Sequence, residues 1–161
     1  MIPYSGARTV VICGSMKNLD LMSRIGDFLR SMGLRAVEPA PDETMANSTI
    51  EASMRSKRAA SRRHMDHIRA DDTAAVLVVN VDRPGAQHYV GPNAFAEIGV
   101  AFSDDRQVFL LHGMPDAYAE ELGAWDVTCL NGDIEPLLEA LAVPNQVNLS
   151  AWRETVQSAP A

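Results

Sequence analysis

Short apolar runs alternate with segments of helical periodicity along most of this chain. Runs rich in Val, Ile and Leu predict strands at residues 9–13, 34–38, 74–81, 107–111 and 127–130. Apolar residues spaced three and four apart predict helices over about residues 19–32, 49–69, 92–102 and 133–141. Strands that alternate with helices form parallel sheets covered on both faces. We therefore expect an α/β fold, a single doubly wound, flavodoxin- or Rossmann-like domain with about five mostly parallel strands.

The length of 161 residues fits one such domain. The periodic pattern ends near residue 141, so the domain is predicted to span residues 1–141. Residues 142–161 contain two prolines and one tryptophan and show no clear period. We expect them to form a C-terminal tail that is loosely attached or lies over a neighbouring subunit.

The chain is acidic overall, with 14 basic and 21 acidic residues and a net charge of −7. This balance argues against a nucleic-acid binder and against a membrane-surface binder, because both need positive potential. The basic residues are unevenly spread. Residues 52–65, the basic segment, contain no acid and hold Arg55, Lys57, Arg58, Arg62 and Arg63. Most of these side chains are expected in solvent, but one or two that reached a pocket would attract an anionic small molecule.

The two cysteines, Cys13 and Cys129, lie in predicted strands. At such positions, buried free thiols in a reducing compartment are a more common arrangement than a disulfide. The sequence shows no secretion signal, and its longest apolar run, residues 74–79, is too short to span a bilayer. We expect a cytoplasmic protein.

Several common catalytic motifs are missing from the chain. It has no GxxxxGK[ST] phosphate-binding loop, no GxGxxG after its first strand and no GxSxG nucleophile elbow. No group of cysteines and histidines has the spacing of a zinc site. His64 and His67 can share a helix face, but the chain has only two other histidines. We therefore expect neither a metal nor a cofactor.

Residues 89–102 carry the clearest candidate site. Gly91, Pro92 and Asn93 begin a helix directly after a predicted loop, and the free N–H groups of a helix start attract anions. Glu97 lies one turn after Asn93 on the same face and is the only acid between residues 83 and 103. It can therefore face a sugar whose phosphate binds at Gly91 and Asn93. The alternative is an ordinary glutamate on the solvent side of the helix.

Three segments resemble one protein family when they are taken together in order. They are residues 13–16 (CGSM), residues 64–68 (HMDHI) followed by Asp72, and residues 91–93 (GPN) with residues 96–101 (AEIGVA). In this order and spacing the chain resembles the nucleoside 2-deoxyribosyltransferase-like superfamily, which includes the 2′-deoxynucleoside 5′-phosphate N-hydrolases. The resemblance covers about residues 9–140.

The resemblance implies cleavage of the bond between a base and its sugar. Glu97 would be the nucleophile at the anomeric carbon, or would stabilise an oxocarbenium-like centre. Gly14 and Ser15 would face the sugar or the base, although a tight turn needs only the glycine. Asp82 would bind ribose hydroxyls, or would simply belong to a turn. Asn131 would help to complete the site of a neighbouring chain, which makes a homodimer the expected assembly.

Two departures from the family pattern weaken a strict transferase interpretation. Residues 88–93 contain no acid, and the position eight residues before Asp72 holds His64 instead of an aspartate. His64 could donate a proton, contact a phosphate or pack beside the sheet. Asp72 could take part in catalysis or could orient the start of a strand.

We therefore expect a nucleoside 5′-monophosphate N-glycosidase whose partner is a small-molecule nucleotide or nucleoside. One alternative is base exchange by a nucleoside deoxyribosyltransferase. The other is a non-catalytic sensor that binds nucleotides in the same pocket.

Overall fold

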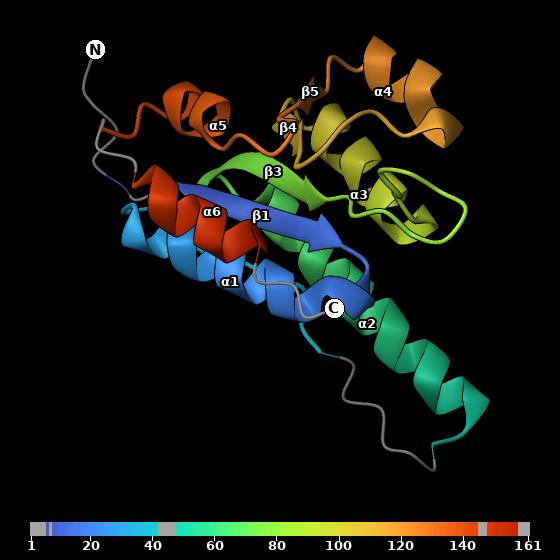
Figure 1. The fold of residues 1–161 in the computed structure, drawn as a ribbon. Coiled ribbons are helices and arrows are strands. Elements are labelled where there is room, and N and C mark those ends of the chain that lie inside the picture. Colours follow the sequence, from blue (N-terminus) through green and yellow to red (C-terminus); the bar gives the residue numbers. More distant parts are fainter. Residues whose placement is uncertain (1–5, 7, 42–47, 145–147, 158–161) are drawn as a thin grey trace.

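A computed structural model describes residues 6, 8–41, 48–144 and 148–157 of the chain. It contains a parallel sheet with the strand order β2-β1-β3-β4-β5 (Figure 1). The strands are β1 (Thr9–Gly14), β2 (Arg35–Val37), β3 (Thr73–Val79), β4 (Gln107–Leu110) and β5 (Thr128–Cys129). This arrangement confirms the predicted doubly wound α/β fold.

Helices cover both faces of the sheet. One face packs against α1 (Leu19–Ser31), α5 (Glu135–Ala140) and α6 (Leu149–Gln157). The other face packs against α2 (Ile50–Arg69), α3 (Pro92–Ser103) and α4 (Ala119–Ala124). Two short 3₁₀ turns, Met16–Asn18 and Asp116–Tyr118, precede α1 and α4.

Successive side chains of β1 point alternately to the two faces of the sheet, and so into the two helical layers. Val10 and Ile12 point into the core on the α1 side, whereas Val11 and Cys13 point into the core on the α2 and α3 side. This two-residue period is the normal geometry of a strand. It places the side chain of Cys13, near the carboxyl end of β1, beneath the two helices that carry the predicted site.

The chain reverses its direction of winding between β1 and β3, which are neighbours in the sheet although β2 lies between them in sequence. Ligands of doubly wound folds bind beside such a switch point, at the carboxyl ends of the strands. With 20 residues, α2 is about 30 Å long and exceeds the strands it covers. Its N-terminal half therefore extends past the carboxyl edge of the sheet (Figure 1).

The structure shortens the third predicted strand and adds one short helix. β3 ends at Val79 because the next residue, the fully buried Asn80, uses its side chain to join two loops. Its Nδ2 donates to the Gly113 carbonyl at 2.8 Å, and its Oδ1 accepts from the His112 N–H at 2.9 Å. The six-residue helix α4 was not predicted because it is too short to display a helical period.

The predicted tail also contains a helix that packs on its own domain. In α6, Trp152 is 3% exposed and belongs to the same buried cluster as α1 and the sheet. Its ring lies 5.0 Å from the ring of Phe28, and its Nε1 donates to the Gly132 carbonyl at 2.8 Å. Residues 149–157 therefore complete the core instead of forming a loose tail, while residues 145–147 and 158–161 lie outside the described residues.

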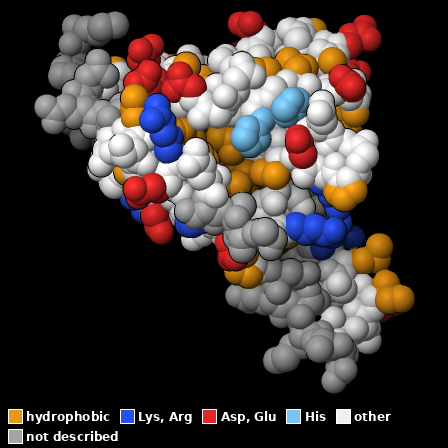
Figure 2. All heavy atoms as spheres, in the orientation of Figure 1, with side chains coloured by type: hydrophobic (Ala, Val, Ile, Leu, Met, Phe, Trp, Pro, Cys, Tyr) orange, Lys and Arg blue, Asp and Glu red, His pale blue; other side chains and the backbone are white. Residues whose placement is uncertain are grey.

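Charge is distributed unevenly over the surface. Figure 2 shows Lys and Arg side chains gathered over α2, and Asp and Glu side chains over α4 and α5. The basic segment is thus one exposed helix beside the carboxyl edge of the sheet. Within the described parts of the chain, no helix combines the length and the apolar character that crossing a membrane requires.

Candidate functional site

A pocket of about 310 Å³ opens beside the carboxyl end of β1, between α2 and α3. Small-molecule sites commonly measure roughly 300–1,000 Å³. Gly14 lines the pocket, and a Cβ at this position would come within 3.1 Å of the Val79 carbonyl oxygen. A glycine therefore suits the close approach of β1 to β3 at this point.

The α2 side of the pocket carries a polar stripe. Lys57, Ser61 and His64 line the pocket and follow the spacing of one helix face. Seven residues of helix separate Lys57 from His64 by about 10 Å along the axis. His64 is 6% exposed, whereas Lys57 lies in the exposed half of α2 beyond the sheet. The stripe therefore runs from a buried imidazole to a cation at the mouth.

The α3 side supplies the acid of the pocket. Ala94, Ile98 and Ala101 form the buried face of α3, and Glu97 flanks that face. Asn93, one turn earlier, lines the pocket with it. Among the described lining residues, Glu97 is the only carboxylate. The structure thus brings together the predicted site residues Gly14, His64, Asn93 and Glu97.

Three chemically active side chains meet at the inner end of this pocket. The ligand atoms of Cys13, His64 and Glu97 all lie within 4.8 Å of one another. His64 Nε2 lies 3.5 Å from Cys13 Sγ and 2.9 Å from the Ile12 carbonyl oxygen. Because a carbonyl oxygen can only accept, Nε2 carries the ring proton and donates it to Ile12. His64 therefore ties α2 to β1 through a buried hydrogen bond.

Burial controls the protonation of these three groups. It raises the pKa of Glu97 from the ordinary 4.5 to about 7, and the nearby Cys13 thiol opposes this rise. Burial also lowers the pKa of His64, so the imidazole is neutral at pH 7. The pKa of Cys13 lies well above its ordinary range because of burial and the neighbouring Glu97 charge. At neutral pH the cluster thus holds a neutral imidazole, a protonated thiol and a half-ionised carboxyl.

This pKa has a consequence for stability. The folded protein holds the Glu97 proton more tightly than the unfolded chain, so the resulting stabilisation is complete below pH 4.5 and lost as the pH rises through 7. Replacement of Glu97 by Gln removes this dependence. When the pH is raised from 5.5 to 8, the free energy of unfolding of Glu97→Gln, measured relative to that of wild type, should increase by about 2 kcal/mol. Urea denaturation at both pH values measures the difference.

Glu139→Gln is the matched control, because Glu139 is exposed on α5. It should show no change in relative stability between the two pH values. His64 is common to all three proteins, so its own titration cancels in the comparison. A constant offset between Glu97→Gln and wild type at both pH values would mean that Glu97 titrates like an exposed glutamate.

Cys13, His64 and Glu97 also form the one group of donors, within the residues that the structure describes, that could together hold a metal ion. A zinc ion would need a thiolate and a ring nitrogen with a free lone pair. Here the thiol keeps its proton, and Nε2 of His64 donates to Ile12. Binding through these atoms would remove the thiol proton, move the ring proton of His64 to Nδ1 and leave a buried carbonyl without its donor. The donor set fits a hydrogen-bonded cluster better than a metal centre.

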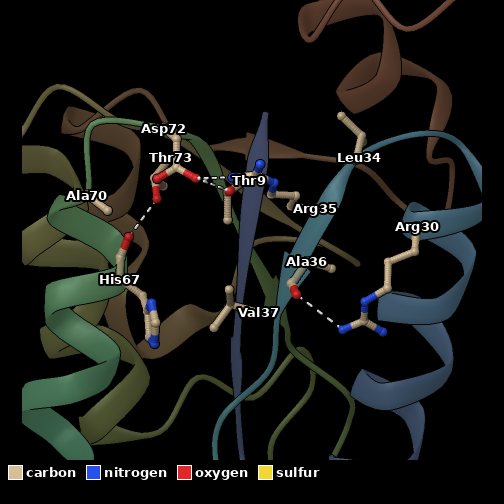
Figure 3. A pocket seen from close by; sticks show the side chains of 10 residues that line it. All are labelled: Thr9, Arg30, Leu34, Arg35, Ala36, Val37, His67, Ala70, Asp72 and Thr73. Atoms are coloured by element: carbon tan, nitrogen blue, oxygen red, sulfur yellow. Dashed lines mark hydrogen bonds and ion pairs between the residues drawn. The ribbon is translucent and has the colours of Figure 1, made fainter. Parts of the chain in front are cut away.

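Asp72 lies at the opposite edge of the sheet. It precedes β3, accepts a hydrogen bond from the Thr9 hydroxyl at 2.8 Å and pairs with Arg35 at 3.3 Å (Figure 3). The Thr9 hydrogen bond is the main cause of its lowered pKa. These residues line a separate hollow at the amino ends of β1 and β2. The predicted catalytic role of Asp72 therefore finds no support in its position, and the residue orients the start of two strands.

Asp82 also lies outside the pocket of Glu97. Its Oδ1 accepts from the His88 N–H at 2.7 Å, which shapes the loop after β3. It lines another hollow, of about 560 Å³, together with Arg83 and Tyr89. The structure thus gives Asp82 the turn role that the sequence left open, and does not bring it to a sugar bound beside Glu97.

The remaining predicted residues do not line the pocket in this chain. The Ser15 hydroxyl accepts from the Lys17 N–H and caps the first 3₁₀ turn. Gly91 precedes α3 as its N-cap residue. Asn131 is exposed after β5, where its N–H donates to the His112 carbonyl at 3.3 Å. A contribution of Asn131 to a neighbouring chain stays a prediction.

Three residues of the site carry no individual signal in the sequence. Cys13 belongs to the segment 13–16, but its thiol has no predicted role, and Lys57 is one basic residue among five. Ser61 becomes distinctive only through its spacing from Lys57 and His64, which would have placed all three on one helix face. Comparisons of the chain with models of known protein families and with curated proteins find no match.

Proposed function

We propose that this protein is a nucleoside 5′-monophosphate N-glycosidase that releases the base from the sugar. The observation that carries the proposal is Glu97, a half-buried carboxyl with a pKa of about 7 that lines a pocket of small-molecule size. Strongly perturbed carboxyls in pockets are frequent at catalytic sites. The family resemblance of the segments around Gly14, His64 and Glu97 supports the same chemistry.

Glu97 would act in its ionised form. The carboxylate attacks the anomeric carbon, the bond to the base breaks, and a glycosyl ester forms. Water then attacks the same carbon, which frees Glu97 and yields a sugar phosphate. A second carboxylate, as in most glycosidases, is not found among the described lining residues.

His64 is poorly placed to protonate the leaving base. Its Nε2 proton is engaged with the Ile12 carbonyl, and its lowered pKa leaves the ring without a second proton at pH 7. His64 would instead hold the inner end of α2 against β1, and the leaving base would take its proton from a donor other than His64, for example water. This role replaces the proton-donor alternative that the sequence left open.

Lys57 supports a phosphorylated substrate. Of the five basic side chains in the basic segment, it alone is among the described residues that line the pocket. With Lys57 at the mouth and Glu97 deeper inside, an anionic group can bind outside while the anomeric carbon lies at the carboxylate. Charge-assisted contacts of this kind contribute about 1.5–3 kcal/mol.

Lys57→Ala should raise KM for the nucleoside 5′-monophosphate about tenfold, because it removes one charge-assisted contact. KM for the corresponding nucleoside should change little. Arg62→Ala and Arg63→Ala are matched controls, since both side chains are exposed on α2 and absent from the pocket lining. Steady-state kinetics on both substrates measure the effect. Equal changes for nucleotide and nucleoside would remove Lys57 from phosphate recognition.

The function itself is tested with a panel of nucleotides and nucleosides. We expect free base to appear by chromatography with at least one 5′-monophosphate and no added acceptor. A new nucleoside that forms only after a second base is added would favour base exchange. Saturable binding seen as a thermal shift, without any release of base, would favour the nucleotide sensor and contradict the proposal.

A further inference from the structure

The thiol of Cys13 has no part in the proposed reaction, although it lies beside the groups that do. Cys13 is fully buried near the carboxyl end of β1, on the α2 and α3 side of the sheet. Its sulfur lies 3.5 Å from His64 Nε2 and within 4.8 Å of the Glu97 carboxylate. A polar hydrogen in such a position needs an acceptor.

The hydrogen bond of His64 determines which acceptor is open to the thiol. Because Nε2 of His64 donates to the Ile12 carbonyl, it has no lone pair for the thiol hydrogen. Glu97 is the other member of the cluster, and an ionised carboxylate only accepts. The direction of the thiol bond is thereby fixed from Cys13 to Glu97.

We propose that Cys13 is a positioning residue, whose thiol donates a hydrogen bond to Glu97 and holds the carboxylate in the orientation and ionised form that attack requires. This inference rests on the proposed function. Cys13 and His64 lie close to Glu97. Among the described lining residues, the other polar side chains of the pocket are Lys57 and Ser61 from α2 and Asn93 from α3 itself. A hydrogen bond to the charged form of a carboxyl favours that form, and the thiol bond accordingly opposes the rise in the pKa of Glu97.

Two replacements separate the hydrogen bond from the volume of the side chain. Cys13→Val fills the site but cannot donate, whereas Cys13→Ser keeps a donor. In Cys13→Val, the acid limb of the kcat/KM profile should move up by about half to one pH unit. At pH 6, kcat/KM should therefore be about three- to tenfold lower than in wild type, while KM changes little. At high pH, kcat/KM should return to the wild-type value.

Cys13→Ser should keep the acid limb of wild type. Cys129→Ser should behave as wild type because Cys129 lies in β5, outside the cluster of Cys13, His64 and Glu97. A purely structural role would lower activity at every pH without moving the limb. An unmoved limb in Cys13→Val, or equal shifts in the Val and Ser variants, would overturn the proposal.

A second measurement leaves Cys13 in place and needs no substrate. In the Cys129→Ser protein, Cys13 is the only thiol, so the S–H stretching band of the infrared spectrum reports on it alone. The band should move to lower frequency as the pH rises, with a midpoint near the Glu97 pKa of about 7. Glu97→Gln in the same protein should abolish this transition.

A band that does not respond to pH would overturn the inference even if nucleotides are cleaved. If the band shifts as expected but the protein releases no base, the hydrogen bond is supported and the proposed function is contradicted. The two failures are thus distinguishable.

Discussion

Glu97→Gln is expected to lower kcat for base release at least about 1,000-fold, which corresponds to roughly 4 kcal/mol of transition-state stabilisation. The amide has nearly the shape of the carboxyl, but it cannot form the glycosyl ester or balance positive charge at the anomeric carbon. Steady-state or single-turnover release of base, followed by chromatography, measures the loss. The affinity for the nucleotide should remain within about fivefold by calorimetry, since Lys57 still lines the mouth.

A chemical rescue sharpens this test. Glu97→Ala opens space beside the anomeric carbon, so added formate can supply the missing carboxylate and should restore part of the turnover. Glu139→Gln, on the exposed face of α5, should retain full activity. If Glu97→Gln keeps more than about a tenth of the wild-type rate, the covalent or charge-stabilising role fails, because loss of a nucleophile costs several orders of magnitude.

The fold could be predicted because its signal is local and repeated. Each buried strand shows as a short apolar run, and each long helix shows as an apolar face. The end of an element is harder to predict when it depends on distant residues. β3 ends before Asn80 because the side chain of Asn80 makes hydrogen bonds to His112 and Gly113, which lie more than 30 residues away. Such long-range contacts leave no mark in a window of the sequence.

The residue that carries the site could be predicted, but its chemistry could not. Glu97 was conspicuous as a single acid in an apolar helix. Its raised pKa comes from burial between helix and sheet, and the thiol of Cys13, which lies in a strand more than 80 residues earlier, opposes the rise. The protonation state of Glu97 therefore depends on tertiary packing, which the local sequence does not show.

His64 and Asp72 show how a sequence spacing can mislead. The seven residues between them run along the last turns of α2 and into the turn before β3. This path carries the chain by about 10 Å from the level of the pocket to the amino edge of the sheet. The two residues share a motif but not a site.

The sequence also could not predict which basic side chain of the basic segment lies in the pocket. Five basic residues on one helix point in several directions, and the sequence cannot tell which direction faces the pocket. Packing of His64 and Ile68 against the sheet fixes the rotation of α2. Lys57 then falls on the pocket side by its spacing from His64, whereas Arg62 and Arg63 remain in solvent.

Trp152→Ala should lower the free energy of unfolding by about 3–5 kcal/mol, the usual effect of replacing a buried tryptophan by alanine. The side chain is 3% exposed, packs against Phe28 and donates to the Gly132 carbonyl, so both the cavity and an unpaired carbonyl contribute. Trp152→Phe should cost less, because it keeps an aromatic ring while losing the N–H donor. Urea denaturation followed by circular dichroism measures these changes.

Leu149→Ala is the matched control, because Leu149 lies in the same helix but is 38% exposed. It should cost less than about 1 kcal/mol. If Trp152→Ala were equally mild, α6 would be a separable appendage, as the lack of periodicity in residues 142–161 suggested. A large loss would instead show that the chain needs this helix to close the face of α1, and with it the layer opposite the one in which Cys13, His64 and Glu97 meet.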